Sequence, residues 1–256
     1  MTTVKDVMAL QNINLDTLGQ YASLLQRFAD FAGVLPNVND QGKDLGALCR
    51  TIVMDEFARR WVPPNAPFPT FTESLSVLRE LLTSDPETME MTQDMQAHLY
   101  RAVAYQKGRS LITTSDGRIG LAPSDTKLGD EICTLLGCDK PVVLRETNLT
   151  FNVVGTAYVD GLMYGDALLG PLPQGISLVL AEGYDGYYNH NMREVSREDP
   201  RLGPLPPEWQ RVAHDKDSSY TMFYRVDGGH ETTSDPRLSV DALRQRGLPL
   251  ETFLLL

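Results

Sequence analysis

The sequence predicts an α+β protein, in which an N-terminal helical part packs on a small, curved antiparallel β-sheet or barrel. Apolar residues recur every three or four positions up to about residue 107, whereas short β-prone runs separated by turns follow from residue 108. The 256 residues, of which 42% are hydrophobic and 22% charged, are sufficient to bury such a core. We expect three parts, residues 1–107, 108–170 and 171–256, with the last two forming one compact unit.

Two helices are expected first. An apolar stripe from Leu15 to Phe31 predicts a helix that ends near Gly33. A second stripe runs from Leu45 to Trp61, and the proline-rich segment WVPPNAPFPT closes it. Core packing is the ordinary role of such stripes, so we assign these residues to the core.

Capping signals predict two more helices. Thr70 and Glu73 have the spacing of a capping box, which satisfies the free backbone donors at a helix start. Asp85 and Pro86 supply a cap and a first-turn proline for a fourth helix, whose stripe from Met91 to Val103 would face inward.

The second part of the chain has the two-residue period of strands. The segment RSLITTSDGRIGLA predicts a hairpin around Ser115–Gly117, because glycine tolerates positive φ. Further strands are predicted at EICTLL, PVVLRE and FNVVGTAYV, and such short strands indicate a strongly curved sheet or barrel. The last eighty residues contain long polar loops and end in a short helix, SVDALRQRG, and no internal repeat is evident.

Charge and composition exclude several functions. The net charge of -11 and the absence of a basic run argue against binding to nucleic acid or to an anionic membrane surface. No stretch has the roughly 18 apolar residues of a membrane span, and the start of the chain has no signal-peptide core, so we expect a cytoplasmic protein. The three cysteines lack CxxC spacing and are expected to be reduced thiols.

Motifs of common enzyme classes are missing from the sequence. It contains no GxSxG elbow, no GxxxxGK[ST] phosphate loop, no GxGxxG after a strand and no HExxH helix. We therefore expect no cofactor and no metal. His214 has Asp215 and Asp217 beside it, but a solvated polar loop is the simpler interpretation of that segment.

Tyrosines and one arginine are candidate binding residues. A buried phenol combines an apolar body with one donor, which suits a hydrophobic ligand with a few oxygens, although packing of sheet surfaces is the more common role. Arg145 on the strand PVVLRE could point into a cavity as a fixed cation, or pair with Glu146, Asp160 or another carboxylate. The structural pairing is the simpler of these alternatives.

The C-terminal segments LPPEW and HETTSDPRL, residues 205–209 and 230–238, resemble the two ends of a WW domain. Trp209 and Pro236 match the pair that holds a WW sheet together, whereas Ser234 stands beside the place of the tryptophan that grips polyproline. The resemblance implies a degenerate WW-like segment that closes the C-terminus onto the barrel, with no proline-peptide site. Loops that it gathers, including Tyr184 to His190, could roof a pocket.

The middle block GRSLITTSDGRIGLAPSDTKLGDEICTLLG, followed by PVVLRE and FNVVGTAYVDGLMYGDAL, resembles the region downstream of the HET domain in fungal heterokaryon-incompatibility proteins. DPRLGPLPPEW and the closing DPRL segment also resemble tails in that group. Asp160 stands where we would expect a histidine, and Gly137-Cys138 where we would expect paired glycines. The HET module itself is missing, which suggests a tail region that works alone.

A second resemblance, at the level of architecture alone, is to norbornene-forming Diels-Alder enzymes of fungal natural-product pathways. It implies a cofactor-independent cyclase that carries out an intramolecular [4+2] cycloaddition on a hydrophobic terpenoid. The expected donors are Tyr158, Arg145 and His230, and the expected wall residues are Tyr164, Tyr187 and Trp209. Two alternatives stay open, a non-catalytic interaction or regulatory module and a small-molecule binding protein, and the oligomeric state is open as well.

Overall fold

The first strand of the protein lies in the middle of its largest sheet. The computed structural model describes residues 1–10, 17–34, 45–59, 69–85, 88–181, 184–212, 222–229 and 231–256. Strand β1 (Thr2–Ala9) pairs with β2 on one side and with β4 on the other. The sequence had predicted a helical part up to residue 107, and this strand was not anticipated because only its first half alternates, with Val4 buried and Lys5 exposed.

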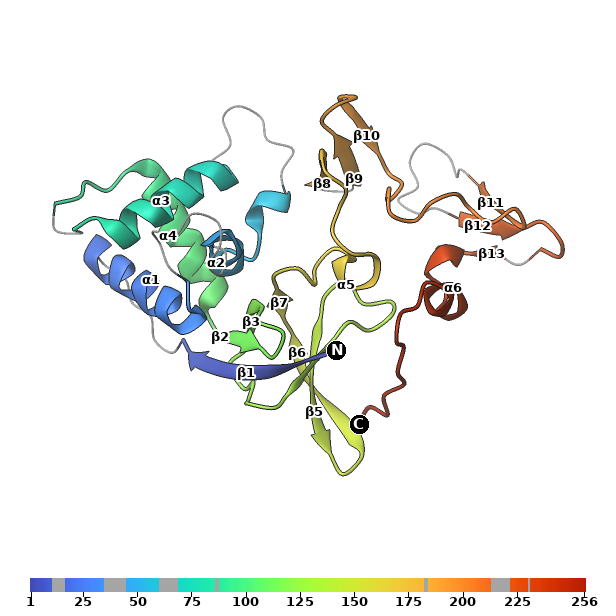
Figure 1. Ribbon diagram of the computed structural model, residues 1–256, viewed down its shortest axis with the longest axis horizontal. Helices are drawn as coiled ribbons and strands as arrows, with labels where there is room; N and C mark the ends of the chain where they lie inside the picture. The colour runs from blue at the N-terminus through green and yellow to red at the C-terminus, as the bar shows by residue number, and fades with distance from the viewer. Residues whose placement is uncertain are drawn as a thin grey trace. The chain divides into compact units, whose positions relative to one another are not determined.

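Seven antiparallel strands form this sheet, in the order β6-β5-β4-β1-β2-β3-β7. The remaining members are β2 (Arg109–Thr114), β3 (Ile119–Pro123), β4 (Glu131–Cys133), β5 (Val142–Thr147), β6 (Thr150–Thr156) and β7 (Tyr158–Val159). Only Ala157 separates β6 from β7, so the two outer strands of the sheet are consecutive pieces of one bent segment (Figure 1). The sheet therefore nearly closes on itself, which confirms the predicted curved sheet and the α+β class.

Local geometry in this sheet follows the sequence. The β2–β3 hairpin turns where predicted, with the Gly117 N–H donating to the Thr114 carbonyl at 2.9 Å and a φ of +86° at Gly117. Gly120 has a second requirement, because a Cβ atom there would lie 2.5 Å from the Tyr158 carbonyl oxygen. Strand β3 can approach β7 this closely only with glycine at that position.

Four α-helices of the N-terminal half fold over one side of the sheet: α1 (Leu18–Ala32), α2 (Leu45–Ile52), α3 (Phe71–Thr83) and α4 (Gln93–Gln106). The α1 helix begins with a capping box at Thr17 and ends at Gly33 in the left-handed conformation. The predicted capping box of α3 is confirmed, since Thr70 Oγ1 accepts from the Glu73 N–H and the Glu73 carboxylate accepts from the Thr70 N–H.

Two predicted helix boundaries were wrong. The second helix ends at Ile52, because Met54 and Asp55 both take positive φ angles and a 3-10 turn, η1 (Glu56–Arg59), follows. Trp61 lies outside the described residues. The fourth helix begins at Gln93, where Thr92 Oγ1 accepts from the Met95 N–H at 3.1 Å and thereby supplies the cap expected from Asp85. Pro86, its expected first-turn proline, lies outside the described residues.

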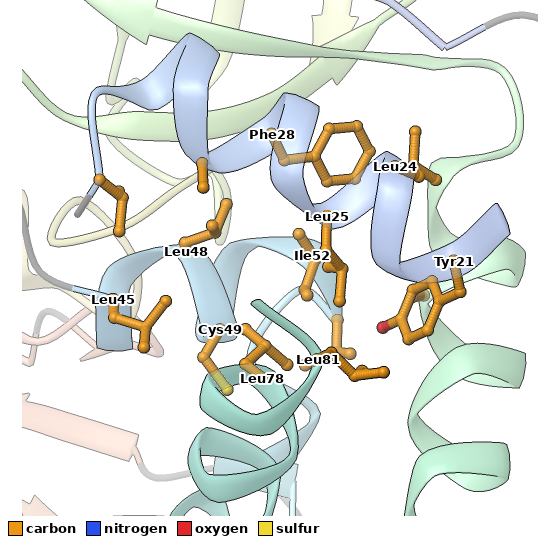
Figure 2. Packing of buried hydrophobic residues seen from close by; sticks show 14 of the residues in the cluster. Tyr21, Leu24, Leu25, Phe28, Leu45, Leu48, Cys49, Ile52, Leu78 and Leu81 are labelled. Carbon is orange, nitrogen blue, oxygen red and sulfur yellow. The ribbon is translucent and has the colours of Figure 1, made fainter. Parts of the chain in front are cut away.

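The apolar core formed by these helices and the seven-stranded sheet has two parts. Figure 2 shows side chains of α1, α2 and α3 directed into one shared core, among them Leu25, Ile52 and Leu78, which are fully buried. A second cluster draws one residue from each of six strands and Ala157 from the bend between β6 and β7, as the interior of a nearly closed barrel does: Val4, Ile112, Ala122, Ile132, Val143, Ala157 and Val159.

The chain divides into two units. The first contains Met1–Phe57, Val62–Tyr164 and Leu254–Leu256, and the second contains Ala58–Trp61 and Gly165–Phe253. The second unit comprises α5 (Asp166–Leu169), β8 (Ile176–Ala181), β9 (Tyr184–Asn189), β10 (Glu194–Ser196), β11 (Trp209–Val212), β12 (Met222–Arg225), β13 (Glu231–Thr232), η2 (Pro236–Leu238) and α6 (Val240–Gln245). Strands β8–β10 and β11–β13 form two separate three-stranded antiparallel sheets (Figure 1).

These two sheets belong to two copies of one module, so the expectation that the chain has no internal repeat was wrong. Module 1 (residues 170–202) begins with GPLPQGI and ends with DPRL, and module 2 (residues 203–238) begins with GPLPPEW and ends with DPRL. The N–H of the first strand residue donates to the carbonyl three residues earlier in both modules, from Ile176 to Pro173 at 3.1 Å and from Trp209 to Pro206 at 2.9 Å.

Strand register confirms the repeat. The first residue of β8, Ile176, lies opposite Asn189, just as the first residue of β11, Trp209, lies opposite Arg225. The central strands pair with the third strands in the same way, with Tyr187 opposite Ser196 in module 1 and Phe223 opposite Thr232 in module 2. The three-stranded frame implied by the WW resemblance is thus present in module 2, and module 1 has the same frame.

The last three residues return to the first unit. The Phe151 N–H donates to the Leu254 carbonyl at 2.8 Å, and the Leu256 N–H donates to the Phe151 carbonyl at 3.0 Å. This parallel bridge extends the sheet beyond its outer strand β6. The hydrogen bonds that attach the C-terminus to the barrel are therefore made by the tail after module 2.

Candidate functional site

A pocket of about 380 Å³ lies on one face of the module 1 sheet. Side chains alternate between the two faces of a strand, and those of directly paired residues share a face. The pairings of Ile176 with Asn189, Asn189 with Glu194, and Tyr187 with Ser196 place these five residues on the pocket face. The remaining lining residues are Met192, Val195, Glu198, Asp199, Pro200 and Gly203.

Tyr187 is fixed at the wall of this pocket. Its hydroxyl donates to Asp199 Oδ2 at 2.8 Å, and its side chain is half-buried. Burial, together with the hydrogen bond to Asp199, raises the pKa of Tyr187 to about 12. The phenol is therefore neutral near neutral pH and is held in one orientation.

A buried arginine holds the loop that carries Asp199. Arg201, whose side chain is only 4% exposed, donates from Nε and Nη2 to the two oxygens of Asp199 at 2.9 and 2.7 Å. Its Nη1 donates to Asp166 Oδ1 and to the Gly170 carbonyl, both at 2.7 Å. Although burial opposes both shifts, these contacts raise the pKa of Arg201 and lower that of Asp199. Both groups stay charged, as a bidentate pair requires.

Arg237 repeats this arrangement in module 2 and also braces the pocket. It donates from Nε and Nη2 to Asp235 at 3.0 and 2.7 Å, and from Nη1 to the Gly203 carbonyl and Glu198 Oε1. Gly203 and Glu198 both line the pocket of module 1. The hydrogen bond from Arg237 is the main cause that lowers the pKa of Glu198.

The charges around the pocket favour a neutral or cationic ligand. Asp199 and Glu198 already pair with Arg201 and Arg237, so their negative charges are compensated. Glu194 is exposed and adds a carboxylate to the pocket face. Ile176 and Pro200 add apolar surface beside these polar groups, a mixture typical of small-molecule sites.

Tyr158, a predicted donor, is buried in the first unit. Its side chain is 2% exposed, and its hydroxyl donates to Asp160 Oδ1 at 3.2 Å. Asp160 also accepts from Arg50 Nε at 2.7 Å and from Nη2 at 3.0 Å, which links helix α2 to the end of β7. Burial, followed by the charge of Asp160, holds the pKa of Tyr158 well above its usual range. The aspartate found where a histidine was expected thus serves as the carboxylate partner of Arg50.

Arg145, the second predicted donor, makes a structural pair. Its Nε and Nη2 donate to the two oxygens of Asp130 at 2.8 and 2.7 Å, and Nη2 also donates to the Asp125 carbonyl. This is the pairing that the sequence favoured for Arg145, with Asp130 as the carboxylate. The hydrogen bonds to Asp130 raise the pKa of Arg145.

The other two predicted site residues that the structure describes are not among the residues that line this pocket. Tyr164 ends the first unit with a positive φ of 54°, Trp209 begins β11 in module 2, and His230 lies outside the described residues. Among the predicted residues that the structure describes, only Tyr187 lines the pocket. The catalytic roles of Tyr158, Arg145 and His230 stay predictions.

Sequence reasoning missed most of the pocket: Ile176, Asn189, Glu194, Ser196 and Asp199. The signal that could have found them is the pair of repeated strings, GPLP at residues 170–173 and 203–206 and DPRL at residues 199–202 and 235–238. Alignment of these strings places Ile176 on Trp209 and therefore marks module 1 as a second copy of the WW-like frame.

No group of three or more His, Cys, Asp or Glu side chains among the residues that the structure describes is arranged to hold a metal ion. None of the described helices combines the length and the apolar composition needed to cross a membrane.

Comparison with known families identifies one region. Residues 84–170 match the model of the Het-6 beta-barrel domain, so this third of the chain is similar to a HET-related domain. The match spans α4, strands β2–β7 and α5, whereas β1 and the strands of the two modules lie outside it. No curated protein and no solved structure matches the chain.

Proposed function

We propose that the protein is a binding module and that the pocket of module 1 takes a small, largely apolar molecule. The observation that carries this proposal is a pocket of about 380 Å³ on a sheet face whose surrounding loop is fixed by two buried arginines. Small-molecule sites are typically concave and pre-formed, with volumes from roughly 300 to 1,000 Å³.

The fixed geometry of the pocket supports binding, because little conformational entropy is lost when a ligand binds to a site that is already ordered. Arg201 fixes Asp199, and Asp199 fixes the hydroxyl of Tyr187. Arg237 fixes Glu198 and Gly203 from the neighbouring module. The similarity of residues 84–170 to a HET-related domain is consistent with a regulatory role, in which the bound molecule would be the signal.

The experiment is native mass spectrometry of the purified full chain, followed by identification of any bound molecule and titration with it. Tyr187→Ala should weaken binding at least tenfold, which corresponds to about 1.4 kcal/mol. Tyr224→Ala is the matched control, since Tyr224 lies in the central strand of module 2 and outside the pocket lining. Equal binding by wild type and Tyr187→Ala would refute the proposal.

The second candidate is the cofactor-independent cyclase that acts on a hydrophobic terpenoid. Tyr187 favours the cyclase, because this residue was expected to contact the substrate and does line a pocket. Such a site would hold diene and dienophile together and would donate a hydrogen bond to a conjugated carbonyl. Within the pocket lining, Asn189 supplies an amide donor, since its Oδ1 already accepts from the Asn191 and Met192 N–H groups.

Turnover distinguishes the two candidates. A cyclase would convert a linear precursor of the bound molecule faster than the uncatalysed reaction in buffer, and Asn189→Ala would lower the catalysed rate about a hundredfold. Tyr158→Phe and Arg145→Gln test the donors expected from the sequence. A protein that binds the cyclic product without accelerating its formation is a binding module only.

A further inference from the structure

The two modules differ at the position that lines the pocket. Ile176 and Trp209 are the first residues of the first strand in their modules, and each follows a proline three positions earlier whose carbonyl accepts its N–H. The residues opposite them, Asn189 and Arg225, occupy the same place in the central strand. Module 1 therefore has an isoleucine where module 2 has a tryptophan.

The neighbours of these two residues also correspond. Tyr187 takes the place of Phe223, which is 3% exposed, and Pro200 takes the place of Pro236 in the two DPRL strings. Ile176, Tyr187 and Pro200 all line the pocket. The pocket thus occupies the sheet face on which module 2 carries its own indole ring.

We infer that the pocket of module 1 accepts a planar aromatic ring of indole type from a ligand, in the position that Trp209 fills within module 2. This inference rests on the proposed function, because it specifies the ligand of the same pocket. An isoleucine covers less of the sheet face than a tryptophan does, so the surface between Tyr187 and Pro200 is left for an outside ring. An indole is well suited to such a site, because its apolar ring can be buried while its N–H group makes a hydrogen bond.

The carboxylates of the pocket add a charge preference. Arg201 and Arg237 compensate Asp199 and Glu198, whereas Glu194 is exposed on the same face. An amine attached to the ring would gain an attractive interaction with Glu194, and a carboxylate would be repelled. The ligand class is therefore an indole, or a ring of similar size, that carries a neutral or cationic group.

The test is a titration of the full chain with tryptamine, indole and indole-3-acetate, followed by NMR of the module 1 amides. We expect the order tryptamine, indole, indole-3-acetate from tightest to weakest. Ile176→Trp should abolish binding of all three, because its own ring fills the face, whereas the matched variant Ile176→Val should still bind. Glu194→Gln should reduce the preference for tryptamine over indole by up to about fivefold, the range of exposed ion pairs.

A saturated amine that keeps the bicyclic size and the ethylammonium chain of tryptamine, 2-(decahydronaphthyl)ethylamine, separates this inference from the proposed function. If this saturated amine binds as tightly as tryptamine and Ile176→Trp removes both, the pocket is a site but the aromatic preference is wrong. If Ile176→Trp folds and binds tryptamine like the wild type, the inference is wrong. If no variant of the pocket changes binding of any probe or of the copurified molecule, the proposed function fails as well.

Discussion

Arg201 and Arg237 hold equivalent positions in two successive modules, and each joins an aspartate to a glycine carbonyl. Both arginine side chains are buried, with exposed fractions of 4% and 3%. Each binds the aspartate two residues before it through two nitrogens, and each donates to the carbonyl of the glycine that begins its own module, Gly170 or Gly203. One residue thus joins the end of each module to its beginning.

Replacing either arginine should unfold the module that it closes. Breaking one side of a buried ion pair costs about 3 to 5 kcal/mol, because the remaining carboxylates are left without partners. We expect Arg201→Gln to remove hydrogen-exchange protection from β8–β10, and Arg237→Gln to affect both modules, because Arg237 also binds Glu198. Arg225→Gln is the control, since Arg225 and Asp227 form an exposed pair whose loss should change little. Unchanged protection in Arg201→Gln would contradict this role.

The ion pair between Arg50 and Asp160 should stabilise the junction of α2 with the barrel. Two charged hydrogen bonds at 2.7 and 3.0 Å connect side chains that are 29% and 17% exposed. Asp160→Asn should therefore lower the free energy of unfolding by about 2 kcal/mol, and Tyr158→Phe by about 1 kcal/mol. Urea denaturation of the full chain measures both. A combined Arg50→Ala and Asp160→Ala variant whose loss equals the sum of the single losses would show that the two residues do not interact.

Stability should decrease in weakly acidic solution because of His98. Its Nδ1 lies 2.6 Å from the hydroxyl of buried Tyr21, and burial lowers the pKa of His98 from its ordinary 6.5 to about 4. Between these two values the unfolded chain binds a proton that the folded protein does not, so the free energy of unfolding falls as the pH is lowered from 6.5 to 4. The full effect is about 3 kcal/mol.

His98→Gln is the variant that isolates this effect, because glutamine does not titrate and can still contact Tyr21. Carboxylates contribute the same pH dependence to both proteins, so the difference between their urea unfolding curves at pH 7 and pH 4.5 reports His98. We expect the wild type to lose more stability than His98→Gln over this range. Parallel losses would show that His98 is not buried in its neutral form.

The C-terminal tail should protect the outer edge of the barrel sheet. Leu254 and Leu256 pair with Phe151 of β6, which is one of the two outer strands in the sheet order. Deletion of residues 254–256 should expose the Phe151 amide to exchange and should promote association through the uncovered edge. Exchange measurements and sedimentation test both results, and replacement of the same three residues by alanine is the control that keeps the backbone pairing. A Phe151 amide that stays protected after deletion would contradict the pairing.

The sequence by itself determined the elements whose causes are local. The capping box of Thr70 and Glu73, the left-handed end of α1 at Gly33 and the hairpin turn at Gly117 all depend on residues a few positions apart, so their patterns can be recognised without a fold. The curved sheet was predicted for the same reason, since short strands with tight turns have few other arrangements.

Tertiary structure decided the features that depend on distant partners. Strand β1 is defined by pairing with residues more than 100 positions away, and Asp160 is held in place because Arg50 from helix α2 donates to it. The pocket depends on strand pairing and on an ion pair. The pairing places Ile176 and Tyr187 on one face of the sheet, and Arg201 holds Asp199 at the edge of the pocket. Local sequence patterns do not specify which distant residues come into contact, and only the folded chain brings them together.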